Sequence, residues 1–170
     1  QPDAAVAARV ARAVAAAAPR AQRPWGRIAG DFDRLGRPDS TAGRLIADAQ
    51  WIATRDAAKG GAQAALMNPG GVRADLRCAT TPPCDVTYGQ AFTMQPFGNS
   101  LVVMTLSGAQ LRQMLEDQQP PGRERPHFLI PSSSLRYEWH AKAPHGQRVQ
   151  RLTVDGQPVR PDARVRLTVN

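Results

Sequence analysis

The sequence predicts a single α+β domain in which helices pack on a mixed β-sheet. Its 170 residues are enough to bury a core, and 42% of them are apolar, which is within the globular range. Helical and strand patterns follow one another along the chain without a regular strand–helix–strand alternation. This order of patterns is typical of an α+β domain with a mixed sheet.

The first helix is expected over residues 4–18, which are rich in alanine, the residue with the highest helix propensity. Pro19 lacks the backbone N–H that a continuing helix needs, so we expect it to end this helix. Three valines recur at every fourth position and give the helix one apolar stripe: Val6, Val10 and Val14. Residues 19–30 are rich in proline, glycine and arginine and are expected to contain only a short strand.

Further helices are expected over residues 42–54, 88–93 and 109–119. Ser40 and Thr41 offer an N-cap for the first of these, and a pair of prolines follows the last. Asp155 and Gly156 give a hairpin turn signal. Strands are expected in short apolar, β-branched or alternating segments: residues 25–29, 64–67, 86–88, 101–106, 128–130, 135–140, 148–154 and 165–169.

The formal net charge is +8, which raises nucleic acid as a possible partner. The basic residues, however, are spread over the whole chain, with no run of five or more and no interleaved aromatic ladder. We therefore expect no nucleic-acid partner, although scattered positive charge favours anionic ligands such as phosphate esters. No apolar run approaches the roughly 20 residues of a membrane span, so none is expected.

The two cysteines, Cys78 and Cys84, are separated by Ala-Thr-Thr-Pro-Pro. A loop of this length can close as a disulfide, and the two prolines favour a turn within it. Two free thiols, or half of a metal site, are the alternatives; zinc has little support because no second cysteine pair exists. A disulfide would indicate an oxidising compartment, either the periplasm or the exterior of the cell.

The segment Asn68-Pro69-Gly70-Gly71-Val72-Arg73 follows a predicted strand and has the composition of a ligand-binding turn. Gly70 and Gly71 permit positive φ and let a ligand approach the backbone closely. Arg73 can hold a carboxylate or phosphate through two hydrogen bonds, and Asn68 offers both a donor and an acceptor. The alternative is an ordinary turn.

A second distinctive segment is Gln95-Pro96-Phe97-Gly98-Asn99. Because Phe97 stands between a proline and a glycine, we expect it on a loop. An aromatic ring on a rigid turn can stack on a planar base, which is worth ~1–3 kcal/mol, and Asn99 can hydrogen-bond a base edge. The alternative is a core phenylalanine that fills the loop.

Together these segments resemble the C-terminal domain of the bacterial 5'-nucleotidase, 2',3'-cyclic phosphodiesterase and UDP-sugar hydrolase family. The resemblance covers about residues 25–170 and implies the fold of that domain. It identifies residues 25–170 as the substrate-binding domain and residues 1–24 as an interdomain linker helix and linker. The similar segments are residues 43–50, 67–75, 87–89, 92–99, 101–111 and 146–170.

In that family, an N-terminal metallophosphatase-like domain of the same protein holds two divalent metal ions, such as zinc or manganese, and the C-terminal domain supplies the nucleoside pocket. The resemblance implies that Phe97 stacks on the base with Asn99 near it. It implies that Asn68 and Arg73, beside the Gly70–Gly71 turn, touch the sugar hydroxyls or the phosphate side. Arg37 is the nearest match to a further family arginine. No catalytic or metal-binding residue is expected in this chain, which by itself should be inactive.

The sequence departs from the family pattern at three points. A second stacking phenylalanine and a ribose-binding aspartate follow the strand that here ends at Asn170, so the domain is expected to be truncated at its C-terminal end. Ser134 stands where the family often has a glycine near the base pocket, which should alter base contacts. No Asp-x-His or Asn-His-Glu metal motif occurs, and the three histidines are expected to be solvated or structural: His127, His140 and His145.

The expected function is nucleotide recognition within a secreted, metal-dependent 5'-nucleotidase that hydrolyses nucleotide phosphate esters. The expected location is the periplasm or the cell exterior. Two alternatives stay open from the sequence. One is a family member acting on another phosphoester, such as a 2',3'-cyclic nucleotide, a UDP-sugar or NAD, or on a thiosulfonate. The other is a basic binding module without catalytic activity.

Overall fold

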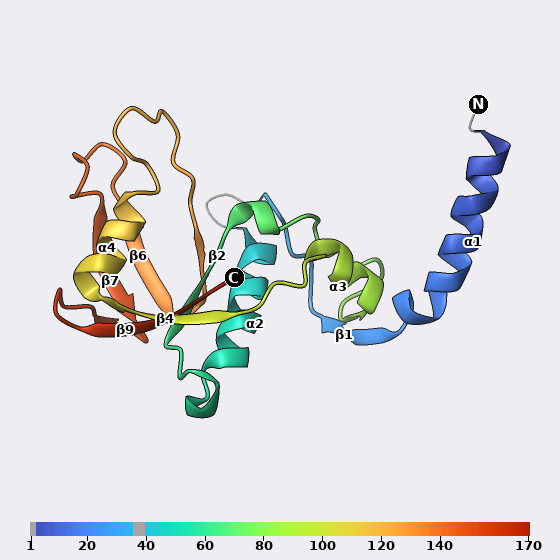
Figure 1. The fold of residues 1–170 in the computed structure, drawn as a ribbon, viewed down its shortest axis with the longest axis horizontal. Coiled ribbons are helices and arrows are strands. Elements are labelled where there is room, and N and C mark those ends of the chain that lie inside the picture. Colours follow the sequence, from blue (N-terminus) through green and yellow to red (C-terminus); the bar gives the residue numbers. More distant parts are fainter. Residues whose placement is uncertain (1–2, 36–39) are drawn as a thin grey trace.

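The computed structural model describes residues 3–35 and 40–170 (Figure 1). Each expected helix and strand is present, with shifted ends. The helices are α1 (Ala4–Ala21), α2 (Thr41–Thr54), α3 (Tyr88–Met94) and α4 (Gly108–Glu116), with short 3-10 turns η1 (Ala57–Lys59) and η2 (Pro69–Gly71). The strands are β1 (Pro24–Ile28), β2 (Ala64–Met67), β3 (Cys84–Thr87), β4 (Val102–Ser107), β5 (Ile130–Pro131), β6 (Leu135–Trp139), β7 (Val149–Val154), β8 (Gln157–Pro158) and β9 (Arg164–Val169).

The central sheet has four strands in the order β4-β9-β2-β5. Strand β9 runs parallel to β2 and antiparallel to β4, while β5 is antiparallel to β2. The β4–β9 ladder pairs Val102 with Val169 at one end and Ser107 with Arg164 at the other. Strands β6, β7 and β8 form an antiparallel sheet, and β1 pairs with β3. The expected α+β fold with a mixed sheet is confirmed.

Strand β2 lies between two hydrophobic cores. Met67 belongs to the core that contains the buried face of α2, whereas Ala64 and Leu66 belong to the core formed with α4, β6, β7 and β9. All four β2 residues are buried, as expected for a strand covered on both faces. The apolar run over residues 64–67 therefore reflects its central position, which fixes where the loop after Met67 emerges.

Helix α1 extends away from the sheets (Figure 1), and none of its residues is buried. The expectation that Pro19 ends this helix is wrong, because the helix continues to Ala21 and the Gln22 N–H bonds to the Ala18 carbonyl at 2.8 Å. Pro19 lies in the last turn, so it removes only the one hydrogen bond that its N–H would have made to the Ala15 carbonyl, and the helix continues past it. The end of α1 is held by Arg20, whose guanidinium lies 5.2 Å from the centre of the Tyr88 ring.

Two predicted boundaries differ from those in the structure. Helix α4 ends at Glu116 rather than at residue 119, because the backbone N–H groups of Gln118 and Gln119 bond to carbonyls three residues back instead of four. The buried Glu116 carboxylate then accepts hydrogen bonds from the backbone N–H groups of Gly146 and Val149 at 3.0 and 2.6 Å. The strand expected over residues 128–130 is also displaced to β5. The Gln118 Oε1 accepts a hydrogen bond from the Leu129 N–H at 2.7 Å, so the pairing of β5 with β2 begins only at the following residue.

Among the described helices, none combines the length and the apolar character that crossing a bilayer requires.

Candidate functional site

The loop after β2 is shaped by the side chain of Asn68. Its Oδ1 accepts a hydrogen bond from the Gly71 N–H at 2.8 Å and so caps η2. Neither Gly70 nor Gly71 has a positive φ, so the expected use of glycine conformation does not hold here. A Cβ at this buried position would meet the Met67 Cε, so the end of the Met67 side chain would have to move.

Arg73 joins this loop to the one that contains Phe97. Its backbone N–H donates to the Met94 carbonyl at 2.9 Å, and its Nη1 donates to the Gly70 carbonyl at 3.3 Å. The guanidinium lies over the Phe97 ring, 6.0 Å from the ring centre. The two segments singled out in the sequence are therefore neighbours in space, although more than twenty residues separate Arg73 from Phe97.

Phe97 is 45% exposed, which excludes the alternative of a core phenylalanine. It lines an open, mainly apolar cleft with a volume of about 560 Å³ between α2, α3 and the loop that leads into β4. Asn99 lines the same cleft, and α3, which also lines it, begins with a capping box between Thr87 and Gln90. The complete lining is Trp25, Leu45, Ile46, Ala49, Gln50, Tyr88, Ala91, Phe92, Met94, Gln95, Phe97, Gly98, Asn99, Leu101 and Asn170.

Arg73 also lines a second open cleft of about 560 Å³, together with Arg34, Asp75 and Arg77. Arg77 forms ion pairs of 2.8 Å with three carboxylates, those of Asp31, Asp33 and Asp75. Arg73 differs, because no carboxylate in residues 3–35 or 40–170 forms an ion pair with it. Its charge is therefore available to an anionic ligand.

The carboxylates around Arg77 hold the segment before α2 against the loop that follows Arg73. The Arg34 backbone N–H donates to Asp75 at 2.6 Å and, with the Arg77 guanidinium, lowers the pKa of Asp75. The Cys78 N–H and Arg77 lower the pKa of Asp31 in the same way. Arg37 lies outside the described residues, so its position relative to this cleft is not part of the structure.

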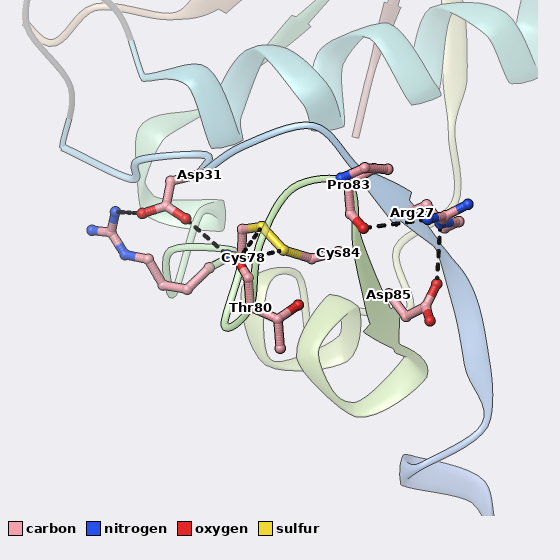
Figure 2. The surroundings of a disulfide bond; sticks show 8 residues. Arg27, Asp31, Cys78, Thr80, Pro83, Cys84 and Asp85 are labelled. Atoms are coloured by element: carbon pink, nitrogen blue, oxygen red, sulfur yellow. Dashed lines mark hydrogen bonds and ion pairs between the residues drawn. A yellow bond between two sulfur atoms is a disulfide. The ribbon is translucent and has the colours of Figure 1, made fainter.

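Cys78 and Cys84 are joined as a disulfide with their Cα atoms 5.4 Å apart, which confirms the sequence prediction. Figure 2 shows the contacts between this loop and nearby residues of β1, β3 and the segment after β1. Asp31 Oδ1 accepts from the Cys78 N–H at 2.7 Å, and Arg27 forms an ion pair with Asp85 at 3.3 Å. The disulfide thus closes a loop that is already tied to β1 and to the segment after it.

Ser134 is buried away from the cleft, so the expected change in base contacts has no support. Its hydroxyl lies 2.9 Å from that of Ser132, which in turn accepts a hydrogen bond from the Ala65 N–H at 2.9 Å.

The three histidines have separate surroundings. His127 is exposed, whereas His140 and His145 lie 3.5 and 3.2 Å from the carboxylates of Glu138 and Asp117. Within the described ranges, no three His, Cys, Asp or Glu residues come together in a way that could hold a metal ion.

A family model for the 5'-nucleotidase C-terminal domain matches residues 20–170. The chain belongs to this family. A solved structure of the 5'-nucleotidase precursor from Thermus thermophilus superimposes with a TM-score of 0.74 and 30% identity, covering 95% of this chain and 32% of that one. The architecture described above is therefore that of a 5'-nucleotidase C-terminal domain.

Two curated relatives have different names. Endonuclease YhcR of Bacillus subtilis is 33% identical over 132 residues, covering 78% of this chain and 10% of the relative. Cell wall protein Lmo0130 of Listeria monocytogenes is 30% identical over 146 residues, covering 82% of this chain and 18% of the relative. The chain thus spans between about a tenth and a third of the lengths of these relatives and of the Thermus protein.

Sequence reasoning missed much of the cleft in this 5'-nucleotidase C-terminal domain. Tyr88 and Phe92 lie one turn apart on α3 and their rings stack, but nothing local in the sequence indicates that Trp25 of β1 lines the same cleft. Gln50 could have been found, because it occupies a buried position at helical spacing from Ile46 and Thr54. A polar side chain on the buried face of an amphipathic helix is an informative exception.

Proposed function

We propose that this domain binds the nucleoside part of a nucleotide and presents the phosphate ester to a separate metal-binding domain of the same protein, which hydrolyses it. The observation that carries this proposal is the pairing of an exposed aromatic ring, Phe97, with an arginine, Arg73, that no described carboxylate neutralises. An aromatic face suits a flat base, and a guanidinium beside it without a carboxylate partner suits the anionic end of a nucleotide. Membership of the 5'-nucleotidase family supports the same assignment.

The ligand contacts follow from the positions of the side chains. Arg73 covers one face of Phe97, so the base stacks on the opposite face, while Asn99 in the same cleft bonds to the base edge. Asn68 is exposed beside Gly70 and Gly71 and meets the sugar hydroxyls or the phosphate side. The gain comes from orientation, because a held nucleoside aims its ester at the reactive centre.

The hydrolytic chemistry is assigned to residues outside this chain. The described residues do not fit a metal site, whereas the chain covers only about a third of the 5'-nucleotidase precursor that it superimposes on. Two divalent ions, such as zinc or manganese, would supply metal-assisted attack of water in that other domain. The chain alone is then inactive, and this domain's residues contribute only binding and orientation.

We place the protein outside the cytoplasm, in the periplasm or beyond it. The disulfide between Cys78 and Cys84 supports an oxidising compartment, and a relative is named a cell wall protein.

The test is the substitution Phe97→Ala in the complete protein. Losing ~1–3 kcal/mol of stacking should raise KM for a nucleoside monophosphate by about 5- to 150-fold, with little change in the melting temperature. Phe128→Ala is the matched control, because Phe128 is 39% exposed and packs edge-on against Trp139 instead of lining the cleft. An unchanged KM in Phe97→Ala would remove the assignment.

A further inference from the structure

Helix α1 contacts the rest of the domain through its last turn. None of the residues of α1, all of which the structure describes, is buried, so no hydrophobic core fixes its direction. The last turn lies against the start of α3, where a Cβ added to Gly89 would come 3.0 Å from the Ala21 carbonyl oxygen. Figure 1 shows the remainder of α1 extending beyond α3 and β1. The direction of α1 is therefore set at this junction.

Tyr88, the first residue of α3, is the centre of the junction. Its backbone N–H donates to the Arg23 carbonyl at 2.9 Å, and its hydroxyl oxygen accepts a hydrogen bond from the Arg20 Nη2 at 3.3 Å. The guanidinium groups of Arg20 and Arg23 each lie over the Tyr88 ring, 5.2 Å from its centre. An aromatic ring attracts a cation placed over its face. These contacts join the end of α1 to the start of α3.

Helix α3 connects the junction to the candidate site. Tyr88 and Phe92 line the cleft, and their ring centres are 5.9 Å apart in a stacked arrangement. At the other end of α3, the Met94 carbonyl accepts a hydrogen bond from the Arg73 N–H, and Phe97 follows three residues later. A helix of seven residues spans about 10 Å, so one short element separates α1 from the ring of Phe97.

We propose that Tyr88 is a positioning residue: held by Arg20 and Arg23, it fixes the angle between α1 and the cleft, and with it the direction in which a bound nucleotide points. This inference rests on the proposed function, in which residues 1–24 are the linker to the metal-binding domain of the same protein. An 18-residue helix is about 27 Å long, so a tilt of about 10° at the junction moves its far end by about 5 Å. A displacement of about 1 Å at a reacting group can slow the reaction about 100-fold, so the junction acts on the hydrolytic step more than on binding.

The two arginines give a sharper test than Tyr88, because Tyr88 lines the cleft and the arginines do not. In the complete protein, Arg20→Ala/Arg23→Ala should lower kcat for AMP about tenfold or more. The value of KM should change less than about twofold, because the residues that hold the nucleoside stay in place. Arg20→Lys/Arg23→Lys keeps a cation beside the ring and should restore most of kcat.

Arg55→Ala is the matched control, because the Arg55 guanidinium lies 5.8 Å from the centre of the Trp51 ring and outside the cleft. This variant should leave kcat and KM unchanged. An unchanged kcat in the double alanine variant, or a higher KM with the same kcat, would overturn the inference and leave the proposed function standing. The proposed function fails on a different result, which is an unchanged KM in Phe97→Ala.

A distance measurement tests the junction without relying on hydrolysis. Spin labels at Ala8→Cys on α1 and Gln113→Cys on α4 occupy exposed positions and report the angle of α1 relative to this domain. The distance between the labels should have one narrow distribution in the complete protein and a much broader one in the double alanine variant. Tyr88→Phe, which loses only the hydroxyl contact to Arg20, is the second variant and should broaden the distribution less. A distribution that stays narrow in both variants would show that Tyr88 does not set the angle of α1.

Discussion

Reducing the disulfide should lower the free energy of unfolding of this domain without unfolding it. The bridge joins Cys78 to Cys84 across a sequence separation of 6, so it closes a loop of seven residues. In the chain-entropy model such a loop removes about 8 cal/mol/K from the unfolded ensemble, which corresponds to about 2.4 kcal/mol at 25 °C. The expected decrease in the melting temperature is about 5–10 °C for a domain of this size.

The folded state should keep its shape after reduction, because other contacts hold both ends of the loop. The Cys78 N–H remains bonded to Asp31, and Cys84 is 2% exposed in a strand that pairs with Ile28. A buried thiol behaves as a small apolar side chain, so breaking the bridge leaves no cavity. The free-energy change should therefore appear mainly in the unfolded state.

The assay is urea denaturation of the domain, monitored by circular dichroism, with and without a thiol reductant. The variant Cys78→Ala/Cys84→Ala is the control, because the reductant should have no effect on it. A decrease below about 0.5 kcal/mol would show that the unfolded loop is already restricted and would refute the entropy argument. Complete unfolding on reduction would refute the claim that the Asp31 and β-strand contacts secure the loop.

Two further predictions concern stability. Gly108→Ala should destabilise the domain by about 1–3 kcal/mol, because the new Cβ at the start of α4 would run into the Arg160 carbonyl. Gly26→Ala is the control, because the space around Gly26 is open, and equal urea midpoints for the two variants would contradict the packing argument. The pKa values of Asp31 and Asp75 are lowered in the folded state, so their contribution to the free energy of unfolding should be complete above their unfolded pKa values, near pH 4. This contribution should be lost as the pH falls through the folded pKa values. Urea midpoints measured between about pH 2 and 7 should fall only at the acidic end, and less steeply in Asp75→Asn; an identical slope in that variant would exclude Asp75 as a source of the loss.

The elements of the domain could be read from the sequence wherever local chemistry decides them. Ser40 caps α2 as its position before an apolar helical pattern indicates, and its Oγ accepts from the Gly43 N–H at 2.9 Å. The two loops around Arg73 and Phe97 could be predicted for the same reason, since each contains proline and glycine within a few residues, which favours a turn. These features depend on neighbours in sequence, so no knowledge of the fold is needed to find them.

Burial could not be read in this way. Residues 101–106 form the clearest strand pattern, yet Val102 and Met104, which share one face of β4, are 53% and 38% exposed. The strand pattern does not show which face of an edge strand other elements cover. The burial of the Glu116 carboxylate depends on backbone donors that lie thirty or more residues away. Such contacts depend on the whole topology and leave no local signal.

The sequence by itself determined the family, the α+β class, the disulfide and the two loops, because each of these rests on residue types at fixed short spacings. Only the tertiary structure decided that Arg73 lies over Phe97 and that Gln50 of α2 lines the same cleft as Phe97. Elements β1, α2 and α3 meet there because each contributes buried residues to the core that also contains Met67 of β2. The sequence gives the chemistry of each side chain, but the distance between two side chains far apart in sequence depends on the fold.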